Sequence, residues 1–565
     1  MRTTTNIKRV ASWAVALLCH SAIALGQRSQ SVRNIAVIGA GAAGSSTAYH
    51  LYKFAEQDGV AVNVTLFEKT DRIGGRTLTI NPFDDPSQAV ELGASIFVQI
   101  NAILYNATQE FGLETTSFGD VEGLLGIWDG EKFVFEIDES LPTWRIALKI
   151  FWKYGVRAPL NTNRLMQATI KKFLGLYQAP YFPFRSLTER TYELDLIPAT
   201  SVNGEIFLKH NNVGESYAHD IVQASTRVNY ASNLATIHGL DTMVSMAPEG
   251  AVSVVGGNWQ IFHSMVKKAN TAVAFNTSVT HIDVDQKDAS EGKYRLKTRP
   301  ASTPTEDEAE YPTLFDDVVI ASPFQFAKIT TADGLLEEPI DEIPYVKLHV
   351  TIFASPLTFS PSFFGLPPDS RVPSTILTTL GPNDDANSGV QGAGKAGFYS
   401  VSTLRNVLNP KSGRLEHLYK IFSPEKVTPA FLSALFGVPV PDDFTGPVTR
   451  DSDDASAFEP ISFYYPHVFH SYPKAYPRVT FQDPVLRDGL YYTSGMDSFI
   501  STMETNALMG MNVARLIVDD IVGVPDGHAA SLKDKQQRIE EANEQKVLGE
   551  GHDNDNSGRG KVEEL

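Results

Sequence analysis

The sequence predicts an α/β fold, in which a Rossmann-like domain is interrupted by an inserted α+β domain. Three observations predict it. A short apolar run, a glycine turn and a helical pattern follow one another at residues 34–55, helical spacing dominates residues 140–250, and short strand patterns return from Gly256 onward. The chain is therefore expected to leave the first domain and to come back to it.

Length and charge limit the kind of protein that this chain can be. With 565 residues, 42% of them hydrophobic, it can bury a large core in two or three domains. Its 48 Lys and Arg against 66 Asp and Glu give a net charge of −18. Because nucleic-acid binding depends on cationic contacts with phosphates, this balance argues against such a binder. The expected partners are small molecules.

The first 26 residues predict a secretory signal peptide. Arg2, Lys8 and Arg9 precede the apolar stretch ASWAVALLCHSAIAL, and small residues precede a cleavage site after Gly26. A membrane anchor is the alternative, but the apolar stretch is shorter than the roughly 20 residues that a span needs. We therefore expect a protein of the secretory pathway, secreted or in a lysosomal or vacuolar lumen, with no transmembrane span in the mature chain.

The single cysteine, Cys19, lies within this signal segment, so the mature chain would contain no thiol. That excludes disulfides, cysteine-ligated zinc and a flavin tethered through cysteine, and no metal site is expected. Three Asn-X-Ser/Thr sequences, at Asn63, Asn106 and Asn276, predict a glycoprotein, although such tripeptides also arise by chance.

The glycine turn lies in AVIGAGAAGSS, residues 36–46. Its glycines, Gly39, Gly41 and Gly44, would let the backbone approach a pyrophosphate whose charge then lies at the positive end of the next helix. A second strand, VNVTLFEK, ends at Glu68, at the distance expected of an acid that binds ribose hydroxyls. Such an acid repels a 2′-phosphate and so argues against NADP. The motif by itself is compatible with a plain turn, with NAD or with FAD.

A second glycine pair favours FAD. DRIGGRT follows Glu68 at once and brings Gly75 and the permanent cation Arg76 near the same pyrophosphate. This element resembles the second fingerprint of flavoproteins in the amine-oxidase and GDP-dissociation-inhibitor superfamily, and AVELGAS, with Gly93 and Ser95, resembles the next element of that group.

The C-terminal segment agrees with this interpretation. In that superfamily a closing strand ends in a glycine and an acid and is followed by a helix whose N-terminus points at the flavin. Gly495 and Asp497 match these positions, and Ser501 to Glu504 open the helix. Backbone N–H groups at a helix N-terminus would stabilise the negative charge of a reduced flavin. The predicted FAD contacts are Gly39, Gly41, Ala42, Gly44, Glu68, Lys69, Gly75, Arg76, Gly93, Ala94, Ser95, Val279, Gly495, Asp497, Met503 and Glu504.

Longer stretches resemble the prenylcysteine oxidase (prenylcysteine lyase) family. They include ELGASIFVQINAILYNATQEFGL, STRVNYASNLATIHGLDTMVSMA, VVGGNWQIF, YKIFSPEKVTPAFLSALFG, FYYPHVFHSYPKAYP and GLYYTSGMDSFISTMETNALMGMNVARL. With the glycine motif they extend from about residue 34 to residue 520. The resemblance implies an FAD-binding Rossmann-like domain of the GR2 type with an inserted α+β substrate domain.

The same resemblance implies an FAD-dependent thioether oxidase. Such an enzyme cleaves farnesyl- or geranylgeranyl-cysteine with O2 and water, giving cysteine, a prenyl aldehyde and hydrogen peroxide. An isoprenoid substrate would need a long apolar cavity, to which IFWKYG and SFYYPHVFH could contribute, although each is more often core. Arg227, Asn229 and Tyr230 are the candidates for the amino-acid end of the substrate or for shaping the flavin face, with a structural salt bridge at least as plausible for Arg227. No catalytic residue is assigned, and His467 and His470 have no partner visible in the sequence.

Two alternatives remain open. The first is a flavin oxidase of the same fold that acts on another apolar metabolite, for instance in a secondary pathway. The second is a prenyl-binding carrier of the GDP-dissociation-inhibitor type without redox chemistry, against which the intact glycines, Glu68 and the signal peptide argue.

The expected organisation has seven segments. They are a signal peptide (1–26), an FAD-binding domain in three parts (27–135, 251–330 and 466–525), a helical cap (136–250), a mixed substrate-binding region (331–465) and a disordered polar tail (526–565).

Overall fold

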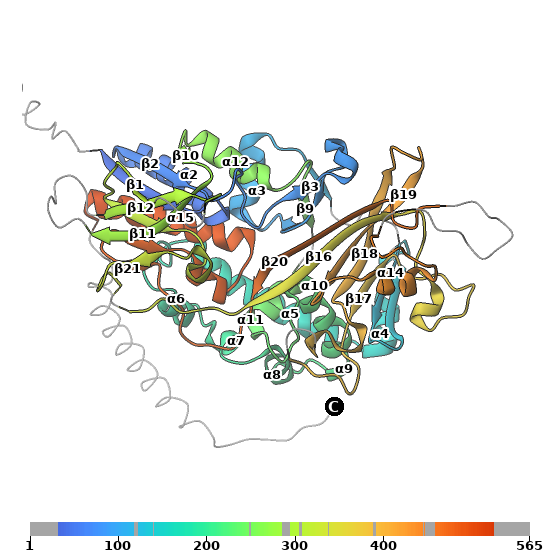
Figure 1. Ribbon diagram of the computed structural model, residues 1–565. Coiled ribbons are helices and arrows are strands. Elements are labelled where there is room, and N and C mark those ends of the chain that lie inside the picture. Colours follow the sequence, from blue (N-terminus) through green and yellow to red (C-terminus); the bar gives the residue numbers. More distant parts are fainter. Residues whose placement is uncertain are drawn as a thin grey trace, which may run out of the picture. The chain divides into compact units, whose positions relative to one another are not determined.

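A six-stranded sheet carries the predicted glycine turn in the computed structural model (Figure 1). The structure describes residues 32–117, 123–138, 140–247, 250–284, 294–303, 308–336, 338–387, 391–444, 446 and 458–524. The predicted signal peptide, Cys19 and the polar tail lie outside these residues. One compact unit ends at Val518 and a second begins at Asp519, so all elements below belong to the first unit except the end of the last helix.

The six-stranded sheet is assembled from three distant parts of the chain. Its order is β10-β2-β1-β14-β22-β21, and every neighbouring pair is parallel except the last. The strands are β1 (Arg33–Ile38), β2 (Val62–Phe67), β10 (Ala272–Ala274), β14 (Asp317–Ile320), β21 (Val485–Arg487) and β22 (Leu490–Tyr492). All four residues of β14 are buried, as the apolar run Val318 to Ile320 predicts for a strand covered on both faces, and Asp317 pairs with Arg33 at 3.1 Å.

Two helices with small residues pack tightly beside this sheet. Helix α2 (Ala42–Asp58) follows the glycine turn directly, and α15 (Met503–Val522) runs beside it. A Cβ atom on Gly510 would lie 2.2 Å from the Ala43 carbonyl oxygen, and the Ser46 hydroxyl donates to the Ala507 carbonyl at 2.6 Å. Only small side chains allow this approach, which fixes the start of α2 relative to α15. Helices α3 (Ala102–Phe111) and α12 (Trp259–Lys268) complete this layer.

A seven-stranded sheet forms the second large layer. Its order is β20-β16-β19-β18-β17-β7-β8, antiparallel except for the parallel pair of β17 and β7. The strands are β7 (Leu124–Trp128), β8 (Phe133–Asp138), β16 (Tyr345–Ser355), β17 (Thr375–Thr378), β18 (Ser400–Leu408), β19 (Leu415–Ser423) and β20 (Phe463–Pro473). An aromatic-rich core around Trp128, Phe353 and Phe398 packs against this sheet.

Three smaller sheets complete the strands in the described part of the chain. One contains β11 (Thr277–Val284), β12 (Tyr294–Pro300), β13 (Ala309–Glu310) and β15 (Thr330–Thr331). Another contains β5 (Phe97–Val98), β6 (Thr115–Ser117) and β9 (Ala251–Val254), and β3 (Thr79–Ile80) pairs with β4 (Val90–Glu91).

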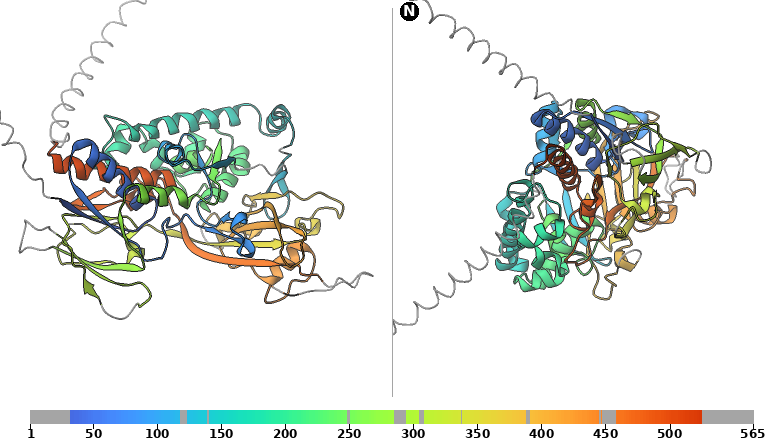
Figure 2. Two further views of the ribbon diagram at one scale, coloured as in Figure 1. Left: turned by 90° about the horizontal axis from the view of Figure 1, so that it is seen from above. Right: turned by 90° about the vertical axis from the view of Figure 1, so that its left-hand side faces the viewer.

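The stretch predicted as a helical cap is mainly helical in its described residues from 143 to 247. The helices are α4 (Thr143–Tyr154), α5 (Arg157–Phe173), α6 (Leu187–Glu193), α7 (Ile197–Thr200), α8 (Gly204–His210), α9 (Glu215–Tyr217), α10 (Gln223–Tyr230) and α11 (Gly239–Ser245). They lie on one side of the yellow and orange strands (Figure 2). The short α13 (Phe324–Ala327) and α14 (Pro429–Phe436) lie outside this group.

Two expected segment limits fall within the seven-stranded sheet. β20 crosses the expected limit at residue 466, and its residues pair with β16 from Phe463 to Pro473. The expected limit at residue 135 lies inside β8, which pairs with β7. Both expected limits therefore cut through a strand of the seven-stranded sheet, and the seven-segment division stays a prediction.

Candidate functional site

A cavity of about 640 Å³ lies where the carboxyl ends of the parallel strands meet the seven-stranded sheet. The residues that follow β1, β2, β14 and β22 line one side, and β16, β19 and β20 line the other. Ligands of open α/β sheets bind outside the carboxyl ends of the strands, and 640 Å³ is within the usual range of ligand pockets. The cavity is therefore the candidate site.

The three glycines of the first turn have three different environments. Gly39 has a φ of 109°, and a Cβ there would lie 2.9 Å from the Ala321 carbonyl oxygen, so only glycine fits. A Cβ on Gly44 would lie 1.9 Å from the Gly39 carbonyl oxygen. At Gly41 the nearest atom to a Cβ would be the Gly75 Cα at 3.9 Å, and Gly41 lines the cavity. Gly39 and Gly44 therefore build the turn, whereas Gly41 leaves space for a ligand.

The N-terminus of α2 opens into this space. Gly41 is its N-cap residue, its first turn has no acidic side chain, and Gly41 to Ala43 line the cavity. The first N–H groups of a helix lack intrahelical acceptors and attract anions. A pyrophosphate would find its donors here.

Glu68 lies at the end of β2 and lines the same cavity. One carboxylate oxygen accepts from the Ala40 backbone N–H at 2.9 Å, and the other accepts from the Thr70 N–H and hydroxyl, both at 2.8 Å. The carboxylate thus holds the glycine turn, and a carboxylate has about four acceptor sites, which leaves capacity for a ribose hydroxyl.

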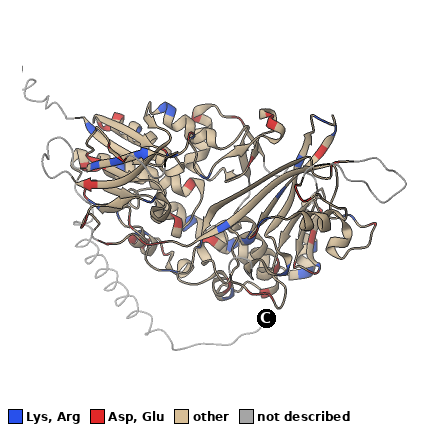
Figure 3. Cartoon of the chain, viewed as in Figure 1, with Lys and Arg blue, Asp and Glu red and all other residues tan. Residues whose placement is uncertain are grey.

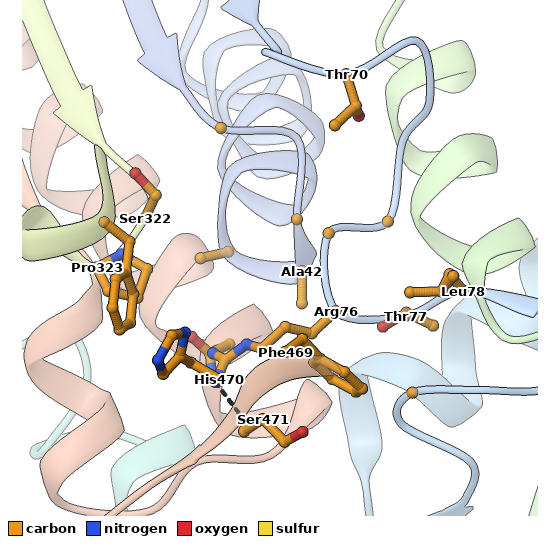
Figure 4. Close-up of a pocket in the computed structure, with 18 of the residues that line it drawn as sticks. Ala42, Thr70, Arg76, Thr77, Leu78, Ser322, Pro323, Phe469, His470 and Ser471 are labelled. Atoms are coloured by element: carbon orange, nitrogen blue, oxygen red, sulfur yellow. Dashed lines mark hydrogen bonds between the residues drawn. The ribbon is translucent and has the colours of Figure 1, made fainter. Parts of the chain in front are cut away.

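The second glycine pair lies against the first turn. The Gly74 N–H donates to the Ala40 carbonyl at 2.9 Å, and a Cβ on Gly75 would lie 3.0 Å from the Gly41 Cα. A larger residue at position 75 would push the two turns apart. The contact between the two motifs therefore explains why position 75 needs glycine, and it brings Arg76 to the cavity (Figure 4).

Arg76 is held by a buried carboxylate. Its guanidinium donates to both oxygens of Asp497, at 3.2 and 3.3 Å, and to the Ser471 carbonyl at 3.0 Å. The Asp497 carboxylate also accepts from Tyr345, Ser501 and Asn506 at 2.5, 2.7 and 3.2 Å. Burial alone raises the pKa of Asp497, but Arg76 and these donors lower it below its ordinary value.

Asp497 itself does not line the cavity, whereas the four side chains that donate to it do: Arg76, Tyr345, Ser501 and Asn506. The sequence pattern selected the carboxylate and Arg76 but missed Tyr345 and Asn506. Tyr345 follows a proline at the start of a strand, and no motif marks it. Asn506 lies in the first turn of α15, nine residues after Asp497. Its place close behind Asp497 in the sequence was the one signal that could have revealed it.

Strand β20 provides most of the opposite wall. His467 to Tyr472 all line the cavity, and the His470 ring stacks on Phe326 with 4.7 Å between ring centroids. Burial and the nearby Arg72 lower the pKa of His467. Figure 4 shows Phe469 and His470 directed toward the space that Ala42 and Arg76 also face. Of the two aromatic pieces considered from the sequence, SFYYPHVFH therefore reaches the cavity through its last four residues.

The other aromatic piece, IFWKYG at residues 150–155, does not line the cavity, in agreement with the alternative that such pieces are more often core. Ile150 and Tyr154 pack on the core, and Phe151 and Trp152 are exposed. The piece belongs to a helix whose inner face is used for packing, so its aromatic residues have no path to the site.

Eleven of the predicted FAD contacts line the cavity: Gly39, Gly41, Ala42, Glu68, Lys69, Gly75, Arg76, Gly93, Ala94, Val279 and Met503. Gly44, Ser95, Gly495, Asp497 and Glu504 lie behind its wall. Ser95 accepts from Lys420 at 3.1 Å, and a Cβ on Gly495 would lie 2.3 Å from the Gln482 carbonyl oxygen. Glu504 accepts from the Ile103 and Leu104 N–H groups at 2.9 and 3.0 Å, and burial raises its pKa to about 7. It caps α3.

The structure contradicts the interpretation of Arg227 as a substrate anchor. Arg227 is fully buried, lies outside the cavity wall and donates five hydrogen bonds of 2.7 to 3.3 Å. A guanidinium has five N–H donors, so none is left for a carboxylate. Its acceptors are Thr378, Asn233 and the carbonyl groups of Gly392, Ala393 and Phe398. Arg227 joins the helical layer to the seven-stranded sheet.

The other two candidates do not line the cavity either. The Asn229 amide donates to the Ser225 and Ser245 carbonyls, at 3.1 and 3.3 Å. Tyr230 packs edge-on against Tyr472, with 6.0 Å between ring centroids, and Tyr472 does line the cavity. Tyr230 therefore supports the wall from behind.

The residues present fit FAD. Gly41 leaves room for a pyrophosphate beside the N-terminus of α2, Arg76 adds a cation, and Glu68 can accept from the adenosine ribose. The cavity continues past them along apolar side chains such as Leu348, Phe422 and Phe469, which suit a flat aromatic ring system and an apolar substrate.

These features define an FAD-dependent oxidoreductase on a Rossmann-like fold. The chain belongs to the prenylcysteine lyase family: the model described as "Prenylcysteine lyase" matches residues 137–526, and that described as "NAD(P)-binding Rossmann-like domain" matches residues 37–111. The predicted family, fold class and cofactor are thereby confirmed.

The chain aligns with its relatives over most of their length, at low sequence identity. The chain is 25% identical to farnesylcysteine lyase from Arabidopsis thaliana over 526 residues, covering 89% of this chain and 92% of the relative. It is 27% identical to human prenylcysteine oxidase 1 over 497 residues, covering 85% and 88%. Cyclohexylamine oxidase from Brevibacterium oxydans has the same fold, with a TM-score of 0.50 at 16% identity over 87% of this chain and 99% of that structure.

Proposed function

We propose that the protein oxidises prenylcysteine thioethers, farnesyl- or geranylgeranyl-cysteine, with FAD as its cofactor. The observation that carries the proposal is that one cavity joins the glycine turns to an apolar wall made by β16, β19 and β20. The prenylcysteine lyase match covers all three strands of this wall, and the relatives named for prenylcysteine or farnesylcysteine align along nearly the whole chain.

The reaction converts the thioether, water and O2 into cysteine, a prenyl aldehyde and hydrogen peroxide. A hydride leaves the carbon bonded to sulfur, a hydroxyl from water adds to that carbon, and the carbon–sulfur bond then breaks as the thiol leaves. FAD, when bound, supplies the acceptor for this hydride, and O2 takes the two electrons onward. The carbon is allylic as well as bonded to sulfur, so positive charge on it is delocalised in two directions.

The protein's task in this reaction is to position the substrate and to exclude water. Leu348, Val350 and Phe469 give the isoprenoid an apolar surface, and Phe326 with His470 forms a flat stacked pair at the wall. Because a hydride leaves the substrate, no strong general base is needed at that carbon. Arg76, held by Asp497, keeps a permanent cation where the cofactor's phosphates are expected.

A peroxide assay with matched thioethers tests this function. The purified protein should release peroxide, prenyl aldehyde and cysteine in equal amounts from farnesylcysteine. S-decylcysteine is a matched control, because it is apolar and carries the thioether but has no allylic carbon, and it should react at least about a hundredfold more slowly, since the charge on carbon is less delocalised.

Peroxide from amines or phenols with none from farnesylcysteine would contradict the proposed substrate and favour the oxidase of another apolar metabolite. A purified protein without the absorption bands of oxidised flavin would instead favour the carrier alternative. The two results are distinguishable because the first retains the flavin.

We also propose that the protein is a glycoprotein of the secretory pathway, secreted or lumenal. The N-terminal charge and apolar pattern supports this, and Asn63, Asn106 and Asn276 are all exposed. Digestion with an N-glycosidase should reduce the apparent mass of the secreted protein; an unchanged mass would contradict glycosylation.

A further inference from the structure

Helix α4 presents large apolar side chains that no described residue covers. Trp152 is 79% exposed and Trp144 62%, and Leu148 and Phe151 are each 45% exposed. These four residues, the α4 row, follow one another at spacings of four, three and one, so they lie along one side of the helix. Val156 and Leu160 extend it past the turn into α5, at 48% and 47% exposure.

The α4 row is not the face by which α4 is anchored. Ile150 and Tyr154 pack on the core cluster of Ile127, Phe135 and Ala224. The Asp220 carboxylate fixes the same side, because it accepts from Lys153 and from the Tyr154 hydroxyl, both at 2.8 Å. The helix thus has an inner apolar face that packs on the core and an outer apolar face, the α4 row, that is exposed.

Cations accompany the outer face. Between Ser140 and Thr188 the sequence has eight Lys and Arg and no Asp or Glu, although the whole chain carries a net charge of −18. Arg145, Lys149 and Arg157 are exposed, and the Arg145 guanidinium lies 5.3 Å from the Trp144 ring centroid. Over the rest of the chain, cationic and anionic residues are interspersed (Figure 3).

We propose that the α4 row and its flanking cations form a docking surface for a lipid bilayer that contains anionic lipids. Tryptophan rings favour the membrane–water boundary, and Lys and Arg beside them are attracted to anionic head groups. The negative charge of the rest of the chain is repelled by such a bilayer, so this face is the one that turns toward it. With 12 residues, α4 is shorter than the roughly 20 residues that a span needs, so it would lie along the bilayer surface. No helix in the described part of the chain is long and apolar enough to cross a membrane.

The charge of this surface favours a bilayer over a second copy of the chain as its partner. Two copies joined through the α4 row would bring the exposed Arg145 and Lys149 of each close together, and like charges at a contact disfavour it. An anionic bilayer instead pairs with these cations and takes up the apolar side chains.

Vesicle flotation with the full-length holoprotein tests the proposal. The protein should float with vesicles of phosphatidylcholine and phosphatidylserine and much less with phosphatidylcholine alone, and added salt should weaken the binding. Trp144→Ser/Trp152→Ser should reduce partitioning by roughly tenfold for each ring. Arg145→Gln/Lys149→Gln should reduce it about fivefold for each cation.

Two variants serve as matched controls. Tyr192 is 78% exposed on α6, and Lys411 is exposed in the turn after β18, so Tyr192→Ser and Lys411→Gln remove an aromatic ring and a cation elsewhere. Both should float like the wild type. All variants should keep the flavin spectrum and the melting temperature, because every changed side chain is exposed.

Equal flotation of wild type and the α4 variants, or equal binding to both kinds of vesicle, would overturn the proposal. So would sedimentation of the lipid-free wild type as a dimer that Trp144→Ser/Trp152→Ser disperses, since a second copy would then cover the row.

Discussion

Replacing Gly41 with valine is expected to abolish FAD retention in a protein that still folds. Gly41 has a φ of −77°, so valine is not strained in the backbone, and a Cβ would meet only the Gly75 Cα, at 3.9 Å. The two methyl groups would project into the cavity beside the N-terminus of α2. Overfilling a tight contact costs about 1–3 kcal/mol, which corresponds to as much as about a hundredfold in affinity. The ratio of flavin to protein after gel filtration measures FAD retention.

Gly214→Val is the matched control for Gly41→Val. Gly214 is also an N-cap residue with a negative φ, −64°, and a Cβ there would meet only the Ala158 Cβ, at 3.7 Å. It lies outside the cavity wall, so this variant should retain FAD. Full flavin occupancy in Gly41→Val would show that the pyrophosphate does not pass this glycine.

Replacing Asp497 with asparagine is expected to destabilise the protein by about 2 kcal/mol and to weaken FAD binding at least about tenfold, since Arg76, whose side chain is 33% exposed at the cavity, would lose its buried charged partner. The new side chain would also present an amide N–H₂ to some of the four donors that the carboxylate accepts from. Arg76 would then lose its fixed position at the cavity. Denaturant unfolding and FAD titration of the apoprotein measure the two effects.

The pH dependence of the same variant has a definite sign. The pKa of Asp497 is lowered in the folded protein, so its contribution to stability is present above the ordinary aspartate pKa, 3.8, and is lost as the pH falls through the lower folded value. Asp497→Asn should therefore lose part of the acid sensitivity of the wild type.

A double-mutant cycle with Arg76→Gln separates the pair from its surroundings. If Arg76 and Asp497 act together, the two single changes should cost more in stability, when summed, than the double change, with a coupling of at least about 1 kcal/mol. Strict additivity would contradict the assigned pair, and unchanged FAD affinity in Asp497→Asn would contradict its role in holding Arg76.

Local patterns predicted much of the cofactor side of the cavity. The glycine turn, β1, β2 and α2 are consecutive in sequence, so the residue types that a βαβ turn requires appear as one motif. Gly75 and Arg76 follow after a short interval, and the contact of Gly75 with Gly41 is local in the same sense. Asp497 was recognisable by its place before α15, although its carboxylate acts through Arg76, Tyr345 and Asn506 rather than at the cavity surface.

The opposite wall of the cavity was harder to predict because it is formed by strands that pair over long distances in the sequence. The six residues of β20 that line it are set there by register with β16, more than a hundred residues earlier in the chain. Arg227 was misinterpreted because four of its five acceptors lie 151 to 171 residues further along the chain, where no local pattern reveals them. The exposure of Phe151 and Trp152 likewise depends on which face of α4 meets the core.

Anaerobic mixing of the purified protein with farnesylcysteine tests the central claim most directly. We expect the visible absorption band of the bound flavin to disappear as the substrate is oxidised and to return when O2 is admitted, with one peroxide released for each thioether cleaved. A flavin band that stays unchanged with farnesylcysteine and geranylgeranylcysteine, in protein shown to contain FAD, would contradict the claim that this cavity oxidises prenylcysteines.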